Sequence, residues 1–257
     1  MSHFVLFAAI PYEEIGADFA ASVYTELALR MDPYCETADK PEFLEFEPDP
    51  DGPDENEAGE PGYFFNPNAQ WDWYSIGGRW PGMLWAAEDA RDVLEDETSS
   101  GPSGDASEGA SLPNGLRAVS GARIRDICWD AMLSQARTAL SDQYRQLQRV
   151  LSGQEEPSRM IFVTKDGICG WGGDLLLKRG EALAEYLERR GAGPGEHLVP
   201  DMYAYLDLDG EWHSKGDMGW WGISSHDKPD SEWTAECRRF LETLRPDDVL
   251  VVVDCHI

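Results

Sequence analysis

The fold of this chain depends on residues 66–85, which read Asn-Pro-Asn-Ala-Gln-Trp-Asp-Trp-Tyr-Ser-Ile-Gly-Gly-Arg-Trp-Pro-Gly-Met-Leu-Trp. The stretch holds four tryptophans, and two adjacent glycines, Gly77 and Gly78, lie between the second and the third of them. Indole rings offer large, stiff contact surfaces, and glycine lets the backbone approach a ligand or another strand closely. A simple connection needs far less aromatic surface, so we expect the rest of the chain to be arranged around this stretch.

Two interpretations of this stretch are open. In the first, Trp71 and Trp73 alternate as on a strand and point into a core, Asp72 faces water, and Gly77-Gly78 forms only a turn. In the second, the stretch walls a binding pocket. Asp72 and Arg79 lie among aromatic rings, where an unpaired charge is costly, so they could pair with each other. A charged pair between aromatic walls is also typical of a pocket for a planar polar ligand.

The composition limits the possible partners. The chain has 257 residues, with 49 acidic against 21 basic side chains and a formal net charge of -28. Such a surface repels phosphate backbones and anionic lipid, which disfavours a nucleic-acid groove unless the protein mimics the polyanion. Much of the excess is local, because residues 42–60 carry nine acids and no base, and residues 88–108 are also acid-rich.

The sequence also predicts a cellular compartment. No apolar run is long enough to cross a bilayer, and the first residues lack the basic region of a signal peptide. The five cysteines have no paired spacing, which favours reduced thiols; they are Cys35, Cys128, Cys169, Cys237 and Cys255. We therefore expect a cytoplasmic protein that has no membrane partner.

The hydrophobic pattern predicts a mixture of strands and helices. A continuous apolar run at residues 4–10 is typical of a central strand buried on both faces, and residues 122–151 carry the longest helical stripe. Asp209-Gly210 predicts a hairpin turn. Further strands are expected over residues 159–164, 168–171, 201–208, 211–213 and 249–253, and further helices over 15–31, 175–190 and 231–244. Ordered structure is expected to resume at 63–65, and residues 86–94 to form a short helix or the end of the aromatic stretch. The absence of a regular strand–helix alternation favours an α+β fold with a mainly antiparallel sheet and packed helices.

Two acid-rich segments interrupt this pattern, at about residues 42–62 and 95–116. The first is rich in acid, proline and glycine and lacks the apolar surface that would order it, so we expect a mobile loop. The second contains Ser-Ser-Gly-Pro-Ser-Gly from Ser99 onward, which is typical of a flexible linker. Because the flanking pieces are too small and too aromatic to fold alone, we interpret both as insertions in a single domain over residues 1–257.

The last predicted strand is followed by residues that could carry chemistry. Asp254 and His256 lie two apart, so their side chains share one face of a strand while Cys255 points to the other. A carboxylate beside an imidazole can orient a general base, or both can bind a divalent metal, and His3 could add a third ligand if the first and last strands are neighbours. The alternative is that His256 is a surface residue and Asp254 a capping or salt-bridged one.

The common catalytic motifs are absent from the sequence. It contains no Walker loop, no Gly-x-Gly-x-x-Gly, no His-Glu-x-x-His and no Gly-x-Ser-x-Gly. The sequence therefore indicates no particular cofactor. His213 and His226 lie in polar segments, where we expect them to be solvated.

Several pieces of the chain resemble a group of uncharacterised proteins found in bacteriophages and actinobacteria. The resemblance includes Asn66-Pro67, Trp71-Asp72-Trp73-Tyr74, Ile76-Gly77-Gly78-Arg79-Trp80, Ser2-His3-Phe4, Met218-Gly219-Trp220-Trp221-Gly222 and Val253-Asp254-Cys255-His256-Ile257. The resemblance implies a shared fold and a shared site, but it implies no particular reaction. One departure is Cys35, which stands where such proteins more usually have aspartate after Pro-Tyr.

Two functions follow as hypotheses. The first is an enzyme, a hydrolase or transferase, that binds a nucleoside-like or amino-acid-like small molecule between two aromatic clusters. Its predicted catalytic residues are Asp254, His256 and Asp72, and its predicted substrate-binding residues are Trp71, Trp73, Tyr74, Arg79, Trp80, Trp220 and Trp221. The alternative is a non-catalytic acidic interaction protein that mimics nucleic acid or interferes with a host. In a third interpretation, both tryptophan clusters are plain core.

Overall fold

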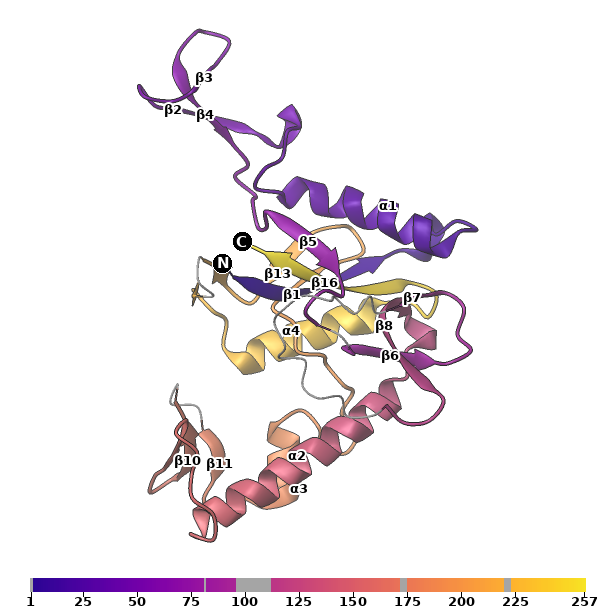
Figure 1. The fold of residues 1–257 in the computed structure, drawn as a ribbon, viewed down its shortest axis with the longest axis vertical. Coiled ribbons are helices and arrows are strands. Elements are labelled where there is room, and N and C mark those ends of the chain that lie inside the picture. Colours follow the sequence, from indigo (N-terminus) through magenta and orange to yellow (C-terminus); the bar gives the residue numbers. More distant parts are fainter. Residues whose placement is uncertain (1, 81, 96–111, 172–174, 220–222) are drawn as a thin grey trace. The chain divides into compact units, whose positions relative to one another are not determined.

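The computed structural model describes residues 2–80, 82–95, 112–171, 175–219 and 223–257 (Figure 1). Its helices and mainly antiparallel strands confirm the predicted α+β class. The chain divides into two compact units, residues 1–127 with 200–257 and residues 128–199, which are described separately here. The single domain expected from the sequence stays a prediction.

The first unit is built on a mixed sheet around β1 (His3–Ile10). β1 pairs antiparallel with β16 (Val249–His256) and parallel with β12 (Ala204–Leu206). The predicted pairing of the first and last strands is therefore confirmed. The order is β13-β12-β1-β16-β8-β6, with β13 at Trp212–Ser214, β8 at Leu116–Arg123 and β6 at Leu84–Ala87, while β5 (Trp73–Ile76) also pairs with β16 and β7 (Val93–Glu95) with β8.

Helices cover both faces of this sheet, so its central strands are apolar over residues 4–10 of β1 and 249–253 of β16. α1 (Phe19–Met31) packs on one face through Val23, Leu27 and Met31, against alternate residues of β1 and β16. α4 (Asp230–Thr243) lies on the other side in Figure 1, where Trp233 and Phe240 stack on Tyr205. Because side chains alternate along a strand, His3, Asp254 and His256 point to the α4 face, whereas Cys255 belongs to the α1 core.

The predicted helix over residues 15–31 begins later than expected. The Asp18 carboxylate accepts a hydrogen bond from the Ala21 N–H and caps the helix, so the first helical residue is Phe19. A 3-10 turn, Asp32–Tyr34, follows at once and contains Pro33. The helix thus stops before Pro33, as the sequence predicts.

The acid-rich segment at residues 42–62 forms regular structure, and the expectation of a loop there is wrong. After a 3-10 turn at Pro41–Phe43, three strands form a small antiparallel sheet, β2 (Glu45–Pro48), β4 (Pro61–Phe65) and β3 (Asp54–Glu55). The rings of Phe46 and Phe64 pack with their centroids 5.1 Å apart. Backbone pairing and this aromatic contact order the segment while its carboxylates stay in water, a solution that composition alone does not reveal.

Strand pairing changes the expected structure of two further segments. Residues 86–94, expected as a short helix or the end of the aromatic stretch, contain the end of β6 and the start of β7, which both pair with β8. The predicted helix over 122–151 begins only at Trp129, because β8 extends to Arg123 and a 3-10 turn follows, with the Arg125 N–H donating to the Pro246 carbonyl. Of the predicted linker over 95–116, residues 96–111 lie outside the described residues.

The second unit is α2 (Trp129–Leu151), a three-stranded sheet and α3 (Leu183–Arg189). The predicted hairpin of β9 (Ile161–Val163) and β10 (Gly167–Gly170) is confirmed. The predicted helix over 175–190 is wrong in its first part, because Leu175–Lys178 forms β11 against β10. Leu147, Val150, Ile168, Leu177 and Tyr186 form the core of this unit.

The remaining elements follow the sequence closely. The hairpin at Asp209-Gly210 joins β12 to β13, and α4 occupies the predicted helix near the C-terminus. Two short strands, β14 (Asp217–Met218) and β15 (Ser224–Ser225), pair with each other. The five cysteines are free thiols. In the part of the chain that the structure describes, no helix has the length and the apolar character needed to cross a bilayer.

Candidate functional site

Two imidazoles lie side by side on the α4 face of the main sheet. His3 of β1 and His256 of β16 are register partners, and their ring centroids are 4.8 Å apart. Figure 1 shows the N and C termini next to each other, since the first and last strands pair along their whole length. The topology thus brings together two histidines from opposite ends of the sequence.

Each imidazole has its own carboxylate. The Nδ1 of His3 is 2.9 Å from the Oδ1 of Asp254, and the Nδ1 of His256 is 2.6 Å from the Oδ1 of Asp72. An ionised carboxylate only accepts, so Nδ1–H donates in each pair and Nε2 is left to accept or donate a proton elsewhere. Among the described residues, neither Nε2 has a hydrogen-bond partner.

The partners differ from those that the sequence suggests. Asp254 and His256 share a face as predicted, yet each bonds to another residue. The backbone N–H of Asp72 donates to the His256 carbonyl, which sets the Asp72 side chain directly beside the imidazole. Asp72 therefore pairs with His256, and the expected pair of Asp72 with Arg79 is not formed.

The two carboxylates lie in different surroundings. The Asp254 side chain is 2% exposed, and its Oδ2 accepts a hydrogen bond of 3.1 Å from the Arg79 N–H. The Asp72 side chain is 31% exposed. Both imidazole side chains are 7% exposed, so the two pairs differ in the exposure of their carboxylates and not of their rings.

The glycine pair of the aromatic stretch makes the Arg79 contact possible. Gly78 has a φ of +54°, and a Cβ on it would lie 2.4 Å from the Cβ of Asp254. Any larger residue would collide with the buried carboxylate as well as adopt an unfavourable backbone conformation. Gly77-Gly78 is therefore more than a turn, because it allows the Arg79 N–H that follows it to donate to Asp254.

We expect Gly78→Ala to lower the free energy of unfolding by about 3 kcal/mol, from backbone strain and overpacking together. Gly115→Ala is the matched control, since Gly115 has a φ of +82° and open space around its Cβ position. It should cost only about 1 kcal/mol. Urea unfolding of both variants measures the difference, and equal losses would show that the contact with Asp254 is unimportant.

Trp73 extends the site toward solvent. Its indole stacks on the His256 imidazole, with centroids 5.1 Å apart and planes at 18°, and it meets His3 edge-on at 5.2 Å. Trp73 is nevertheless 45% exposed. Its ring therefore stacks on one imidazole, meets the other edge-on and remains partly open to solvent.

The other predicted aromatic residues are not gathered around the histidines. Trp71 is 8% exposed within the α1 core, where its Nε1 donates to the Met31 carbonyl, and Tyr74 packs edge-on against it. Trp80 is half-buried, and its indole N–H has no acceptor among the described residues. Trp220 and Trp221 lie outside the described residues. Of the predicted aromatic wall, Trp73 alone is seen to contact the imidazoles.

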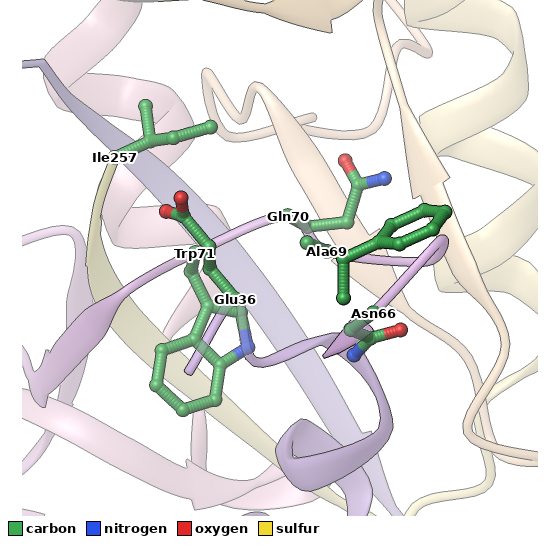
Figure 2. Close-up of a pocket in the computed structure, with 7 residues that line it drawn as sticks. Glu36, Asn66, Ala69, Gln70, Trp71 and Ile257 are labelled. Carbon is green, nitrogen blue, oxygen red and sulfur yellow. The ribbon is translucent and has the colours of Figure 1, made fainter. Parts of the chain in front are cut away.

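A pocket of about 270 Å³ opens elsewhere on the same unit (Figure 2). It is lined by Glu36, Phe65, Asn66, Ala69, Gln70, Trp71 and Ile257. Asn66 cannot offer much to a ligand, because its side chain donates to the Pro33 and Cys35 carbonyls and accepts from the Asn68 N–H. The pocket therefore differs from the one predicted, since neither Arg79 nor either histidine of the paired site lines it.

A cluster with metal-ligand chemistry occurs in the β12–β13 hairpin. Donor atoms of Asp207, Glu211 and His213 lie within 4.8 Å of one another, whereas the sequence predicted only that His213 is solvated. The Oδ1 of Asp207 accepts hydrogen bonds from the Asp209 and Glu211 N–H groups, and its Oδ2 lies 3.1 Å from His213 Nε2. Asp207 therefore stabilises the hairpin turn. In the described ranges, the suggested set of His3, Asp254 and His256 forms no such cluster.

The Cys255 thiol is excluded as a nucleophile for the two histidines. It is fully buried on the α1 face, and this burial raises its pKa well above the ordinary value. The thiol therefore stays protonated and packs as a small apolar group.

Comparisons with protein-family models, curated proteins and solved structures find no match to this chain. The resemblance to phage and actinobacterial proteins stays a prediction. The function is therefore inferred from the geometry of the site alone.

Proposed function

We propose that this protein is a cytoplasmic enzyme, a hydrolase or transferase, that acts on a planar polar small molecule. A single observation carries the proposal: His3 and His256 lie in contact, each with its Nδ1 bound to a separate carboxylate. A carboxylate fixes the tautomer and the orientation of an imidazole, which prepares Nε2 for proton transfer. Two such imidazoles in contact can act on one substrate, where one removes a proton and the other donates a proton.

The surrounding residues have distinct roles in this proposal. His3 and His256 are the catalytic residues, and Asp254 and Asp72 are positioning residues that act through them. Trp73 stacks on a planar part of the substrate, and the exposed Arg79 binds an anionic part through its planar guanidinium. The alternative of a non-catalytic acidic protein stays a prediction.

Isothermal titration against nucleosides, nucleotides and amino acids tests the binding part of the proposal. We expect heat from at least one of these classes, and an affinity loss of about 10-fold or more in Trp73→Leu, because one stacked ring contributes about 1–3 kcal/mol. Trp171→Leu is the control, since Trp171 is an exposed tryptophan of the second unit. Heat from none of the compounds, or equal effects of the two substitutions, would contradict the proposal.

A further inference from the structure

The described part of the site has two acid–base groups, and neither is hydrogen-bonded to a protein nucleophile. Among the described residues, the side-chain hydrogen bonds of His3 and His256 go to carboxylates, and none goes to a hydroxyl or a thiol. Nucleophilic catalysis by serine or cysteine requires a hydrogen bond between the nucleophile and its base. The geometry instead suits a direct displacement, in which one group takes a proton from the attacking water and the other gives a proton to the leaving group.

Building on the proposed function, we infer that the substrate is a phosphodiester of a nucleoside-like alcohol, which the enzyme hydrolyses. Arg79 supplies the group that a phosphodiester requires. Its backbone N–H is fixed on Asp254, its side chain is exposed, and within the described ranges it makes no ion pair. A guanidinium binds two phosphate oxygens at once.

Trp73 supplies the second recognition element. Its stack on His256 places aromatic surface beside the reacting groups, where a base attached to the phosphodiester could lie. In this proposal Arg79 recognises the phosphate by charge, and the nucleoside stacks on Trp73, whose ring contacts both imidazoles.

The reaction balances without any group beyond water. The Nε2 of the neutral imidazole removes a proton from water while the water oxygen forms a new bond to phosphorus. The bond from phosphorus to the leaving oxygen breaks, and its electron pair stays on that oxygen. The other imidazole, protonated at Nε2, donates its proton there. Diester and water become monoester and alcohol, nothing is oxidised or reduced, and proton exchange with solvent restores both histidines.

The net charge of the chain opposes the approach of this substrate. A formal charge of -28 repels an anionic diester at low ionic strength, and salt screens that repulsion. We therefore expect kcat/KM for the diester to rise when salt is added, whereas kcat/KM for a neutral ester should change little.

The test compares two chromogenic esters, bis(p-nitrophenyl) phosphate and p-nitrophenyl acetate, and a dinucleoside monophosphate. We expect hydrolysis of both diesters, a loss of 100-fold or more in the His3→Gln/His256→Gln double variant, and a KM for the diesters that is raised about 10-fold in Arg79→Gln. Arg91→Gln is the control, because Arg91 is another exposed arginine of the same unit.

The possible failures are distinguishable. In one outcome, the two histidines are required for hydrolysis of p-nitrophenyl acetate, but neither diester is hydrolysed. This outcome would overturn the inference and leave the proposed function unaffected. Diester hydrolysis that is unchanged in Arg79→Gln would also overturn it. If none of the three compounds is hydrolysed, and none binds in titration, both the inference and the proposed function fail.

Discussion

Replacing His256 with glutamine should lower kcat by a factor of about 10² to 10⁴, which is the usual contribution of a positioned acid or base. Glutamine keeps much of the volume and can still donate to Asp72, but it cannot exchange a proton near neutral pH. His3→Gln should have an effect of similar size. Because both imidazoles act in the same step, the double variant should lose far less than the product of the two single losses.

The positioning role of Asp72 is tested beside these variants. Asp72→Asn keeps a side chain within reach of the His256 Nδ1, 2.6 Å away in the wild type, yet offers it a weaker partner. We expect kcat to fall about 10- to 100-fold with an unchanged KM and a displaced pH profile. The control is His226→Asn, since His226 is exposed and pairs with Asp217. Full turnover in both single histidine variants would eliminate the twin-imidazole mechanism.

Asp248→Asn is expected to cost about 3 kcal/mol in the free energy of unfolding at neutral pH. The Asp248 carboxylate is fully buried and accepts hydrogen bonds from the Tyr12 N–H at 3.1 Å, from the Arg245 N–H at 2.8 Å and from the Arg245 guanidinium. It therefore ties the start of the chain to the entry of the last strand. Asparagine has one acceptor oxygen in place of two, and it carries no charge to offset that of Arg245.

The dependence on pH gives this prediction a second readout. Burial by itself raises the pKa of Asp248, but the hydrogen bonds from Arg245 and Tyr12 outweigh it and leave the pKa below the ordinary carboxyl value. A carboxyl with a lowered folded pKa stabilises above its unfolded pKa of about 4, and this stabilisation disappears as the pH falls through the folded pKa. The difference in the free energy of unfolding between wild type and Asp248→Asn should therefore be largest at pH 7 and become smaller below about pH 4.

Urea unfolding at pH 7, 5 and 3 measures this gap. Asp209→Asn is the matched control, because Asp209 is an exposed aspartate in a hairpin turn where Asn-Gly is equally favourable. The free energy of unfolding of Asp209→Asn should differ little from that of the wild type at all three values of pH. A gap for Asp248→Asn that stays constant down to pH 3 would contradict the assigned role of its charge.

The sequence by itself determined the elements that carry strong local patterns. The continuous apolar run of β1 marked a central strand, the 3.6-residue stripes marked α1 and α4, and Asp209-Gly210 marked a hairpin. It also singled out Trp73, Asp254 and His256. In each case the signal lies within a few residues, because hydrophobic periodicity and turn chemistry are properties of short segments.

The tertiary structure decided what distant segments do to one another. Strand pairing formed β6 and β7 where the sequence left open a short helix or the end of the aromatic stretch, and backbone ladders ordered an acidic segment that composition marked as a loop. The antiparallel pairing of β1 with β16 set His3 beside His256. As a result, His3 is hydrogen-bonded to Asp254 and His256 to Asp72. Which side chains meet across strands depends on register, and register is set by the packing of the whole sheet, so no local pattern contains it.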